Sequence, residues 1–344
     1  MTEHRLLARL AEGPVICAEG YLFELERRGY LQAGAFVPEV VLDHPERVTA
    51  LHEEFVHAGS DVVEAFTYYA HREKLRIIGK DDLLEPLNRQ ALALAAEVAK
   101  STGTMLAGNV CNTNVYDPAD PDTHARVRDM FTEQVSWAVE AGADFVIAET
   151  LRYHGEAMIA LEVIRETGLP SVVTLVADRS GQSREGLPMV QACQRLVDAG
   201  ADVVGLNCNR GPWTMLPLLA PLVEAVDVPV AALPVPYRTT ADQPTFQSLR
   251  DPAFPEPSIP FPVALDPFTC TRHEITEFTR QAADMGVRYL GLCCGAAPHH
   301  LRAMAEALGR TPPASRYSAD MSKHAYLGTD ASLLAKNQQY ADQL

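Results

Sequence analysis

A repeated junction between a helical pattern and an apolar run limits the possible folds more than any other feature of this sequence. In each copy a glycine follows an amphipathic segment and precedes apolar residues. Glycine readily adopts the left-handed conformation that ends a helix, and the β-branched or aromatic residues after it favour a buried strand. The four copies are His57–Val63, Glu140–Val146, Asp198–Val204 and Asp284–Leu290. Each predicts a helix, a tight loop and a strand.

Further apolar runs without this glycine bring the number of predicted strands to eight. The strands are expected near residues 14–18, 62–67, 105–111, 145–150, 171–177, 203–208, 230–235 and 289–294. Most are nearly continuous apolar runs, which is typical of strands buried on both faces. Helical spacing fills the gaps, as in Val48, Leu51 and Phe55 after Pro45.

Eight strands alternating with helices predict a (β/α)8 barrel, whose active site lies at the carboxyl ends of the strands. The alternative is a doubly wound sheet, which needs glycine-rich phosphate turns or a crevice where the strand order reverses. No Gly-x-Gly-x-x-Gly motif follows any predicted strand. The barrel is therefore the favoured fold.

The 344 residues, of which 47% are hydrophobic, are enough for one large core. We expect one barrel domain over residues 1–309 and a C-terminal tail over 310–344. The tail is polar after Pro312-Pro313 and is expected either to form an oligomer contact or to fray. A long, proline-rich loop from Pro236 to Cys270 is expected to be a functional cover or disordered.

The charge and the cysteine content exclude several functional classes. The formal net charge is -16 and no dense run of Lys or Arg is present, so nucleic acid is not an expected partner. The N-terminus lacks the apolar stretch of a signal peptide or membrane helix, so a cytoplasmic protein without a membrane partner is expected. Seven cysteines in such a chain are expected to be thiols or metal ligands.

Three cysteines lie at predicted carboxyl ends of strands. Cys208 ends the sixth strand, and the adjacent Cys293 and Cys294 end the eighth. These ends flank the seventh strand, so the three sulfurs can converge over the mouth of a barrel. Catalytic zinc sites combine three protein ligands with one open position. The sequence therefore predicts one Zn²⁺ per chain.

Other residues are interpreted as structural. Buried cysteines commonly behave as small hydrophobic side chains, which is the favoured interpretation of Cys111, Cys193 and Cys270. His299 and His300 are rival zinc ligands, but they follow Pro298 and are expected in the solvated first turn of a helix.

The cysteine motifs resemble those of the homocysteine S-methyltransferase family, whose members are zinc-dependent (β/α)8 barrels. The motifs are Gly-x-Asn-Cys at 205–208 and Gly-x-Cys-Cys-Gly at 291–295. Within the family, the similarity is strongest to the betaine–homocysteine methyltransferases and spans roughly residues 14 to 324. It is carried further by Phe23–Tyr30, Ala58–Val63, Phe66–Ala70, Gly286–Gly295, Pro312–Ser315 and Asp320-Met321.

The resemblance implies roles for residues near the acceptor. In the family an aspartate of Asp-Gly-Gly helps to hold the amino group of homocysteine; here the positions read Ala18-Glu19-Gly20, and Glu19 is expected to act from a shifted position. The strand-four glutamate is Glu149, which is assigned a catalytic role and is expected to pair with the amine. Asn207, within the first cysteine motif, is expected to contact substrate.

The donor side departs from the family pattern. The tyrosine after the second strand is retained as Tyr69, which is assigned a catalytic role, and Tyr68 beside it is expected to bind substrate. The tyrosine that follows the strand-four glutamate in betaine users is Thr150 here, and the tryptophan of the first loop is Phe36. The resemblance therefore implies an intact zinc half and an altered donor pocket.

The expected reaction is methyl transfer from a small onium donor, betaine-like or S-methylmethionine-like, to the thiol of homocysteine, giving methionine. A free thiol has a pKa of about 8.5, and coordination to zinc converts it to the nucleophilic thiolate. Aromatic rings near the first two strand ends favour a cationic donor. Two alternatives remain open at this stage: a zinc hydrolase that activates water, and a non-catalytic barrel that binds zinc or thiols.

Overall fold

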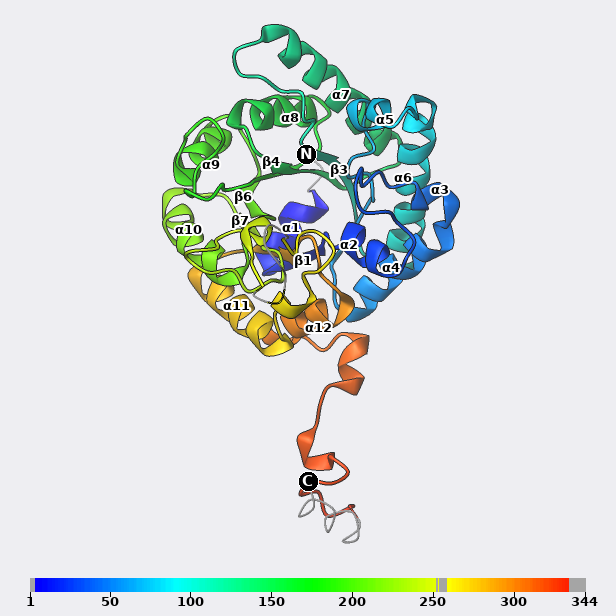
Figure 1. Cartoon of the computed structure of the whole chain (residues 1–344), viewed down its shortest axis with the longest axis vertical. Helices are drawn as coiled ribbons and strands as arrows, with labels where there is room; N and C mark the ends of the chain where they lie inside the picture. Colours follow the sequence, from blue (N-terminus) through cyan, green and yellow to red (C-terminus); the bar gives the residue numbers. More distant parts are fainter. Residues whose placement is uncertain (1–3, 252, 254–258, 334–344) are drawn as a thin grey trace.

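The computed structural model describes residues 4–251, 253 and 259–333 and shows a closed barrel of eight parallel strands in chain order. The strands are β1 (Val15–Ala18), β2 (Val62–Glu64), β3 (Met105–Cys111), β4 (Phe145–Leu151), β5 (Ser171–Leu175), β6 (Val203–Asn207), β7 (Val230–Leu233) and β8 (Tyr289–Leu292). Helices surround this barrel (Figure 1). The predicted (β/α)8 fold is confirmed.

The helices occupy the connections between strands. They are α1 (Arg5–Glu12), α2 (Tyr21–Arg27), α3 (Val40–Asp43), α4 (Pro45–Ala58), α5 (Arg72–Ile77), α6 (Leu84–Thr102), α7 (Pro121–Glu140), α8 (His154–Glu166), α9 (Met189–Asp198), α10 (Pro212–Ala225), α11 (Arg272–Met285) and α12 (Pro298–Ala307). The repeated glycines act as predicted: Gly59 ends α4 at φ 115° and Gly286 ends α11 at φ 110°.

Several strands are shorter than the apolar runs that predicted them. β2 ends at Glu64 rather than 67, β7 at Leu233, and β8 at Leu292. The apolar residues beyond these ends remain buried but follow tight turns; for example, the Thr67 N–H donates to the Ala65 carbonyl at 2.7 Å. The side chains at the mouth of the barrel therefore project from loops immediately after the strands.

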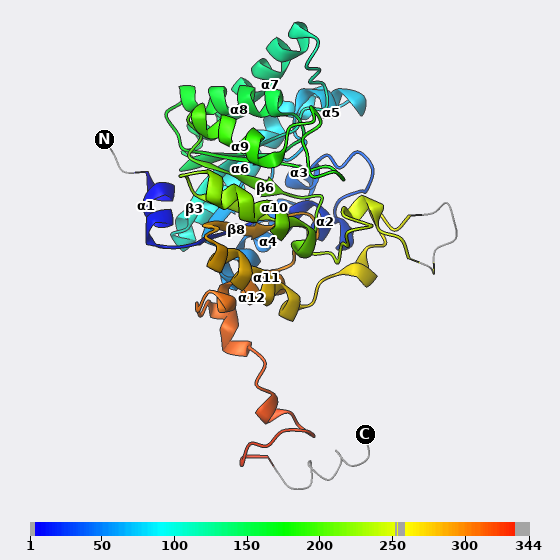
Figure 2. The same ribbon diagram turned by 90° about the vertical axis from the view of Figure 1, so that its left-hand side faces the viewer.

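The two ends of the barrel differ. α1 closes the amino-terminal end, where Leu6 and Leu10 are buried with inward-facing strand residues such as Cys17, Phe145 and Tyr289. Figure 2 shows α1 at one end of the barrel and the long segment after β7 at the other. A substrate must therefore enter at the carboxyl ends of the strands, where the predicted site residues lie.

The described part of the loop between Pro236 and Cys270 is a folded cover over this mouth. An antiparallel bridge joins Tyr237 to Thr269 at its base, and Arg238 forms an ion pair with Glu274 of α11 at 2.8 Å. Phe246 packs against Phe23 of α2 with ring centroids 6.1 Å apart. The sequence left two alternatives for this loop, a cover or a disordered segment. Its described residues are folded over the mouth of the barrel, as expected for a cover.

The chain leaves the barrel after α12 and extends away from it as a tail (Figure 1). The Arg310 side chain pairs with Asp61 at 2.6 Å, and the following residues expose Tyr317, Met321 and Leu327. Residues 334–344 lie outside the described part. The domain boundary at 309 and the oligomer contact stay predictions. In the described part of the chain, no helix is long and apolar enough to cross a membrane.

Candidate metal and substrate site

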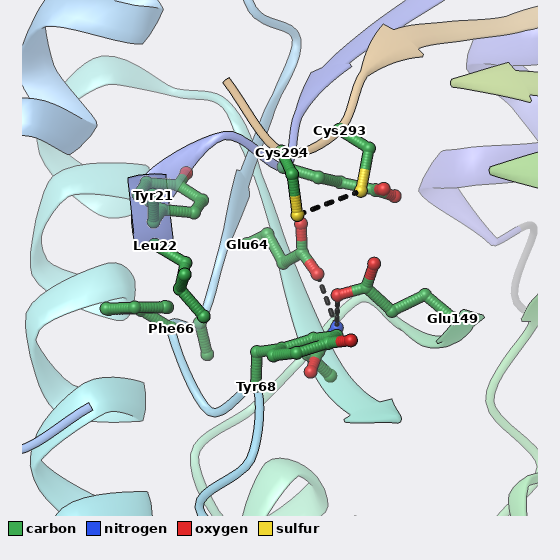
Figure 3. Close-up of a pocket in the computed structure, with 11 residues that line it drawn as sticks. Tyr21, Leu22, Glu64, Phe66, Tyr68, Glu149, Cys293 and Cys294 are labelled. Atoms are coloured by element: carbon green, nitrogen blue, oxygen red, sulfur yellow. Dashed lines mark hydrogen bonds between the residues drawn. The ribbon is translucent and has the colours of Figure 1, made fainter. Parts of the chain in front are cut away.

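The three predicted cysteines meet at the mouth of the barrel. Cys208 directly follows β6, and Cys293 and Cys294 directly follow β8. The Cys294 Sγ lies 3.9 Å from the Sγ atoms of both Cys208 and Cys293, and all three sulfurs lie within 4.8 Å of one another. Figure 3 shows Cys293 and Cys294 above the carboxylates of the barrel interior. The structure thus brings together residues 86 positions apart in the sequence.

The sulfur spacing fits a tetrahedral zinc ion. Zinc binds thiolate at about 2.3 Å, so neighbouring sulfurs around it are about 3.8 Å apart. Hydrogen bonds from the thiol of Cys293, and to a smaller extent from that of Cys294, lower the pKa of Cys208 well below its usual range. The contact with Cys208 raises the pKa of Cys293. One thiolate, on Cys208, is thus stabilised by hydrogen bonds from the neighbouring thiols. A soft metal cation could take the place of the thiol protons and bind all three sulfurs as thiolates.

Two other sets of residues compete as metal ligands. Among the described residues, Glu19, Glu149 and Cys293 also place ligand atoms within 4.8 Å of one another. This mixed set suits zinc less well than three thiolates because it contains a single soft ligand. His299 and His300 belong to neither group of the described residues that could hold a metal.

The expectation of a solvated His300 is wrong. Its ring is completely buried, and Nδ1 accepts the Ala297 N–H at 3.2 Å while Nε2 lies 3.3 Å from the Cys270 carbonyl oxygen. The side chain therefore caps the first turn of α12. Burial lowers the pKa of His300 to about 3, so the ring is neutral.

A narrow, acidic cavity lies beneath Cys293 and Cys294. It has a volume of about 20 Å³ and is lined by the carboxylates of Glu19, Glu64 and Glu149. Asn109 joins two of them, donating to Glu64 at 2.5 Å and to Glu149 at 2.8 Å. No Lys or Arg lines this cavity in the described structure. The carboxylates therefore lack a positively charged partner.

The acidic cavity retains unused hydrogen-bond acceptors. Oε1 of Glu19 and Oε2 of Glu64 are buried and have no hydrogen-bond partner in the described part of the protein. Burial raises the pKa of Glu149 to about 7, and burial together with the neighbouring carboxylates raises the pKa values of Glu19 and Glu64. A bound ammonium group would supply both the missing donors and the missing positive charge.

Asn207 is placed differently from the other predicted substrate residues. It is completely buried, and its Nδ2 donates to Glu149 at 2.9 Å and to Glu19 at 3.3 Å. Its Oδ1 accepts the Thr150 N–H at 2.9 Å. These bonds engage both ends of its amide and orient the two carboxylates. Asn207 itself does not line the acidic cavity.

A second cavity, of about 90 Å³, lies on the other side of the cysteines and has aromatic walls. The predicted Phe36, Tyr68, Tyr69 and Thr150 all line it, with Cys208 and Cys294. Other aromatic walls are Phe23, Phe246 and Phe261. Cys294 and Tyr68 border both this aromatic cavity and the acidic cavity. The cysteines therefore lie between two spaces of different chemistry.

Backbone strain is concentrated around the aromatic cavity. Six non-glycine residues of the described chain have φ between 56° and 64°. Five of them line the aromatic cavity: Phe36, Tyr69, Thr150, Cys208 and Asn209. This left-handed conformation costs about 1–2 kcal/mol for each residue, and such residues cluster at functional sites. Four of these five residues are not cysteines, so the strain is a second indication that this cavity is a functional centre.

Sequence reasoning missed several of these residues. Glu64 lies within a predicted strand and Asn109 within another, and a polar residue inside an apolar barrel strand is a signal that would have identified both. Phe246 and Phe261 come from the long loop, whose sequence has no period that places them over the site. Tyr69 holds a further contact that no pattern indicates: Lys74 Nζ lies 4.0 Å from its ring centroid.

Comparisons with known proteins find similarity along most of the chain. Residues 17–308 match the family described as homocysteine S-methyltransferase. The chain is 35% identical over 337 residues to the S-methylmethionine–homocysteine S-methyltransferase of Mus musculus, covering 96% of this chain and 88% of that protein. It is 36% identical over 344 residues to betaine–homocysteine S-methyltransferase 1 of Danio rerio, covering 96% and 82%.

A solved structure is similar over most of the chain. The metallated form of the homocysteine methyltransferase MmuM from Escherichia coli superimposes with a TM-score of 0.68 at 18% identity, covering 88% of this chain and 99% of that one. At that level of identity, the likeness supports the barrel fold alone.

Proposed function

Because the chain belongs to the homocysteine S-methyltransferase family, we propose that Cys208, Cys293 and Cys294 hold one zinc ion and that a small onium compound donates its methyl group to homocysteine. The product of this reaction is methionine. Bound zinc would keep the substrate sulfur in its thiolate form at neutral pH.

The observation that carries the proposal is the position of Cys294 between the two cavities. The acidic cavity suits the ammonium group of an amino-acid thiol, and the aromatic cavity suits a positively charged methyl donor. A thiol whose amine is bound on one side and a donor bound on the other would meet beside the cysteines. Such alignment of two reactants supplies a large part of the rate enhancement in a bimolecular transfer.

The side chains have separate tasks in this reaction. Glu149, with Glu19 and Glu64, binds the amine of homocysteine, and Asn207 and Asn109 fix the orientation of these carboxylates. The rings of Tyr68, Tyr69 and Phe36 surround the onium methyl groups and exclude water. Thr150 shapes the same wall and donates to Glu149 at 3.1 Å.

The bond changes need no acid catalyst. The sulfur lone pair forms the new S–C bond to the methyl carbon, and the electrons of the breaking C–N or C–S bond stay with the leaving group. An ammonium donor leaves as a neutral amine and a sulfonium donor as a neutral sulfide. Neither leaving group requires a proton, which favours onium donors over methyltetrahydrofolate, whose unprotonated amine would leave as an anion.

The cellular setting proposed here rests on the thiols. All seven cysteines are free, and six of them are buried. A chain with this many unpaired thiols is typical of a reducing compartment, and we assign the protein to the cytoplasm.

The exposed apolar side chains of the tail, including Tyr317 and Met321, support the tail as a contact in a homo-oligomer.

The test is to incubate zinc-loaded protein with homocysteine and one methyl-deuterated donor at a time, and to measure labelled methionine by mass spectrometry. The panel contains glycine betaine, S-methylmethionine and methyltetrahydrofolate. Labelled methionine from an onium donor is expected in the wild type and is expected to be lost in Cys208→Ala. Methionine from methyltetrahydrofolate alone would contradict the donor class. Hydrolysis of the donor without methyl transfer would point to a zinc hydrolase, and binding without any reaction to a non-catalytic barrel.

A further inference from the structure

Arg152 lines the aromatic cavity, but its side chain makes no hydrogen bond or ion pair within the described part of the chain. It follows β4 directly and borders the aromatic cavity together with Thr150 and Cys208. Its Nε is buried without a hydrogen-bond partner, and no ion pair or side-chain hydrogen bond of Arg152 occurs among the residues that the structure describes. A guanidinium group offers five N–H donors, and leaving buried donors unused is unfavourable.

Besides the aromatic cavity, Arg152 borders a polar cavity of about 180 Å³. The other residues that line it are Asn112, Asn114, Tyr116, Tyr153, Glu156 and Arg184. Asn112 donates to the Tyr68 hydroxyl at 3.4 Å and so connects the polar cavity to the aromatic one. Asn114 is the sixth residue with a left-handed backbone, at φ 64°. The strained positions therefore extend across both cavities, with Arg152 between them.

The charges around Arg152 do not balance within the aromatic cavity. Apart from the cysteine sulfurs, Arg152 is the one side chain with a formal charge in its described lining. Glu156 lines the polar cavity and feels the positive charge of Arg152, but its Oε1 accepts from the Thr113 N–H at 2.8 Å and from the Thr113 hydroxyl at 2.6 Å. Among the described residues the two side chains form no direct ion pair. A bare cation in the aromatic cavity would be repelled by this arginine.

We propose that Arg152 is a specificity residue of the donor site and binds the carboxylate of a donor whose other end is the onium group. The inference rests on the proposed function and adds the residue that would select donors with a carboxylate over donors without one. A carboxylate matches the planar fork of a guanidinium and supplies the acceptors that Arg152 lacks. The same carboxylate offsets the arginine charge, while the aromatic rings surround the onium group.

The experiment compares two donors that share a trimethylammonium group. Glycine betaine carries a carboxylate, whereas choline carries a hydroxyl group in its place. Methionine formation and equilibrium binding by isothermal titration are measured for both compounds with wild type, Arg152→Gln and Arg152→Lys. Arg179→Gln is the matched control, because Arg179 is exposed and lines neither cavity. A sulfonium pair, dimethylsulfonioacetate and trimethylsulfonium, repeats the comparison with a different onium group.

Arg152→Gln is expected to raise KM and Kd for glycine betaine about 10- to 100-fold, since a charge-assisted hydrogen bond is lost. The values for choline should change less than about threefold in the same variant. KM and Kd of Arg152→Lys for glycine betaine should lie between those of the wild type and those of Arg152→Gln. Both constants of Arg179→Gln should equal those of the wild type. Equal losses for both compounds, or no loss for glycine betaine, would overturn the proposal.

The outcomes separate this inference from the proposed function. If the wild type forms no methionine from any onium compound, the proposed function fails, while the binding ratio still tests Arg152. If the wild type turns over onium donors and Arg152→Gln does not discriminate between glycine betaine and choline, the role of Arg152 fails and the proposed function stands.

Discussion

The Asn207 amide donates to the Glu149 carboxylate at 2.9 Å, and the residue after Asn207 is Cys208. Two adjacent residues at the end of β6 thus serve both halves of the acceptor site. One fixes the carboxylate proposed to bind the amine of homocysteine, and the other supplies a sulfur to the proposed zinc site. Their common attachment to one strand fixes the distance between the two halves.

Replacement of Glu149 should separate recognition of the amine from binding of the sulfur. Glu149→Ala is expected to raise KM for homocysteine about 10- to 100-fold, because a charge-assisted contact to the ammonium is lost. KM for 4-mercaptobutanoate, which is homocysteine without its amino group, should change little. Steady-state kinetics and zinc analysis of the same preparations check both statements. Equal losses for both thiols would mean that Glu149 supports the fold or the metal instead.

The side chain at position 150 should set the size of donor that the aromatic cavity accepts. In Thr150→Tyr a ring would enter a space of about 90 Å³ and remove the hydroxyl bonded to Glu149. We expect kcat/KM for S-methylmethionine to fall relative to glycine betaine by about tenfold, equivalent to about 1.4 kcal/mol. Thr150→Ser keeps the hydroxyl and the space, so the ratio should not change. A constant ratio in the tyrosine variant would remove Thr150 from the donor pocket.

The glycine after the cysteine pair should be essential for the local fold. Gly295 has φ 97°, and a Cβ there would lie 2.3 Å from the Tyr237 hydroxyl. Gly295→Ala is therefore expected to lower the free energy of unfolding by about 2–4 kcal/mol and to weaken zinc binding. Gly168→Ala is the control, because Gly168 has φ 78° but open space around it, and should cost about 1 kcal/mol. Chemical denaturation distinguishes the two, and similar losses in both variants would refute the steric explanation.

Acid should destabilise the protein partly through His52. Both ring nitrogens of His52 are buried without a partner in the described structure, and burial lowers its pKa to about 3. The unfolded histidine takes up a proton near pH 6.5 while the folded one does not, so this contribution is complete above that pH and is lost as the pH falls toward 3. Between pH 7.5 and 5 the wild type should lose about 2 kcal/mol more than His52→Phe. If urea denaturation shows that the wild type and His52→Phe lose the same free energy of unfolding over this pH range, the assignment to His52 is contradicted.

Much of the fold follows from local sequence. The glycine junctions identify helix ends such as Gly59 and Gly286 because the left-handed conformation is a property of one residue and its neighbours. The cysteines were also predictable, because motifs at strand ends must converge in a closed barrel. Both inferences depend on patterns of a few residues together with one rule of topology.

The remaining parts of the site depend on long-range geometry. A glutamate inside an apolar strand signals that Glu64 is a functional residue, but which carboxylates it meets is set by the stagger of the closed barrel, which a single strand does not encode. Phe246 reaches the aromatic cavity through a loop without periodicity, and Arg152 borders it one residue beyond the end of β4. His300 was misplaced because a first-turn position does not reveal that the ring caps its own helix.

Zinc analysis of purified cysteine variants tests the central claim most directly. The wild type and Cys193→Ala should each contain about one zinc ion per chain, because Cys193 is buried away from the three clustered sulfurs. Cys208→Ala, Cys293→Ala and Cys294→Ala should each lose nearly all zinc, together with methionine formation, because two thiolates are too few for a stable site. Full zinc content in any of these three variants, or a zinc-free wild type that still forms methionine, would contradict the account.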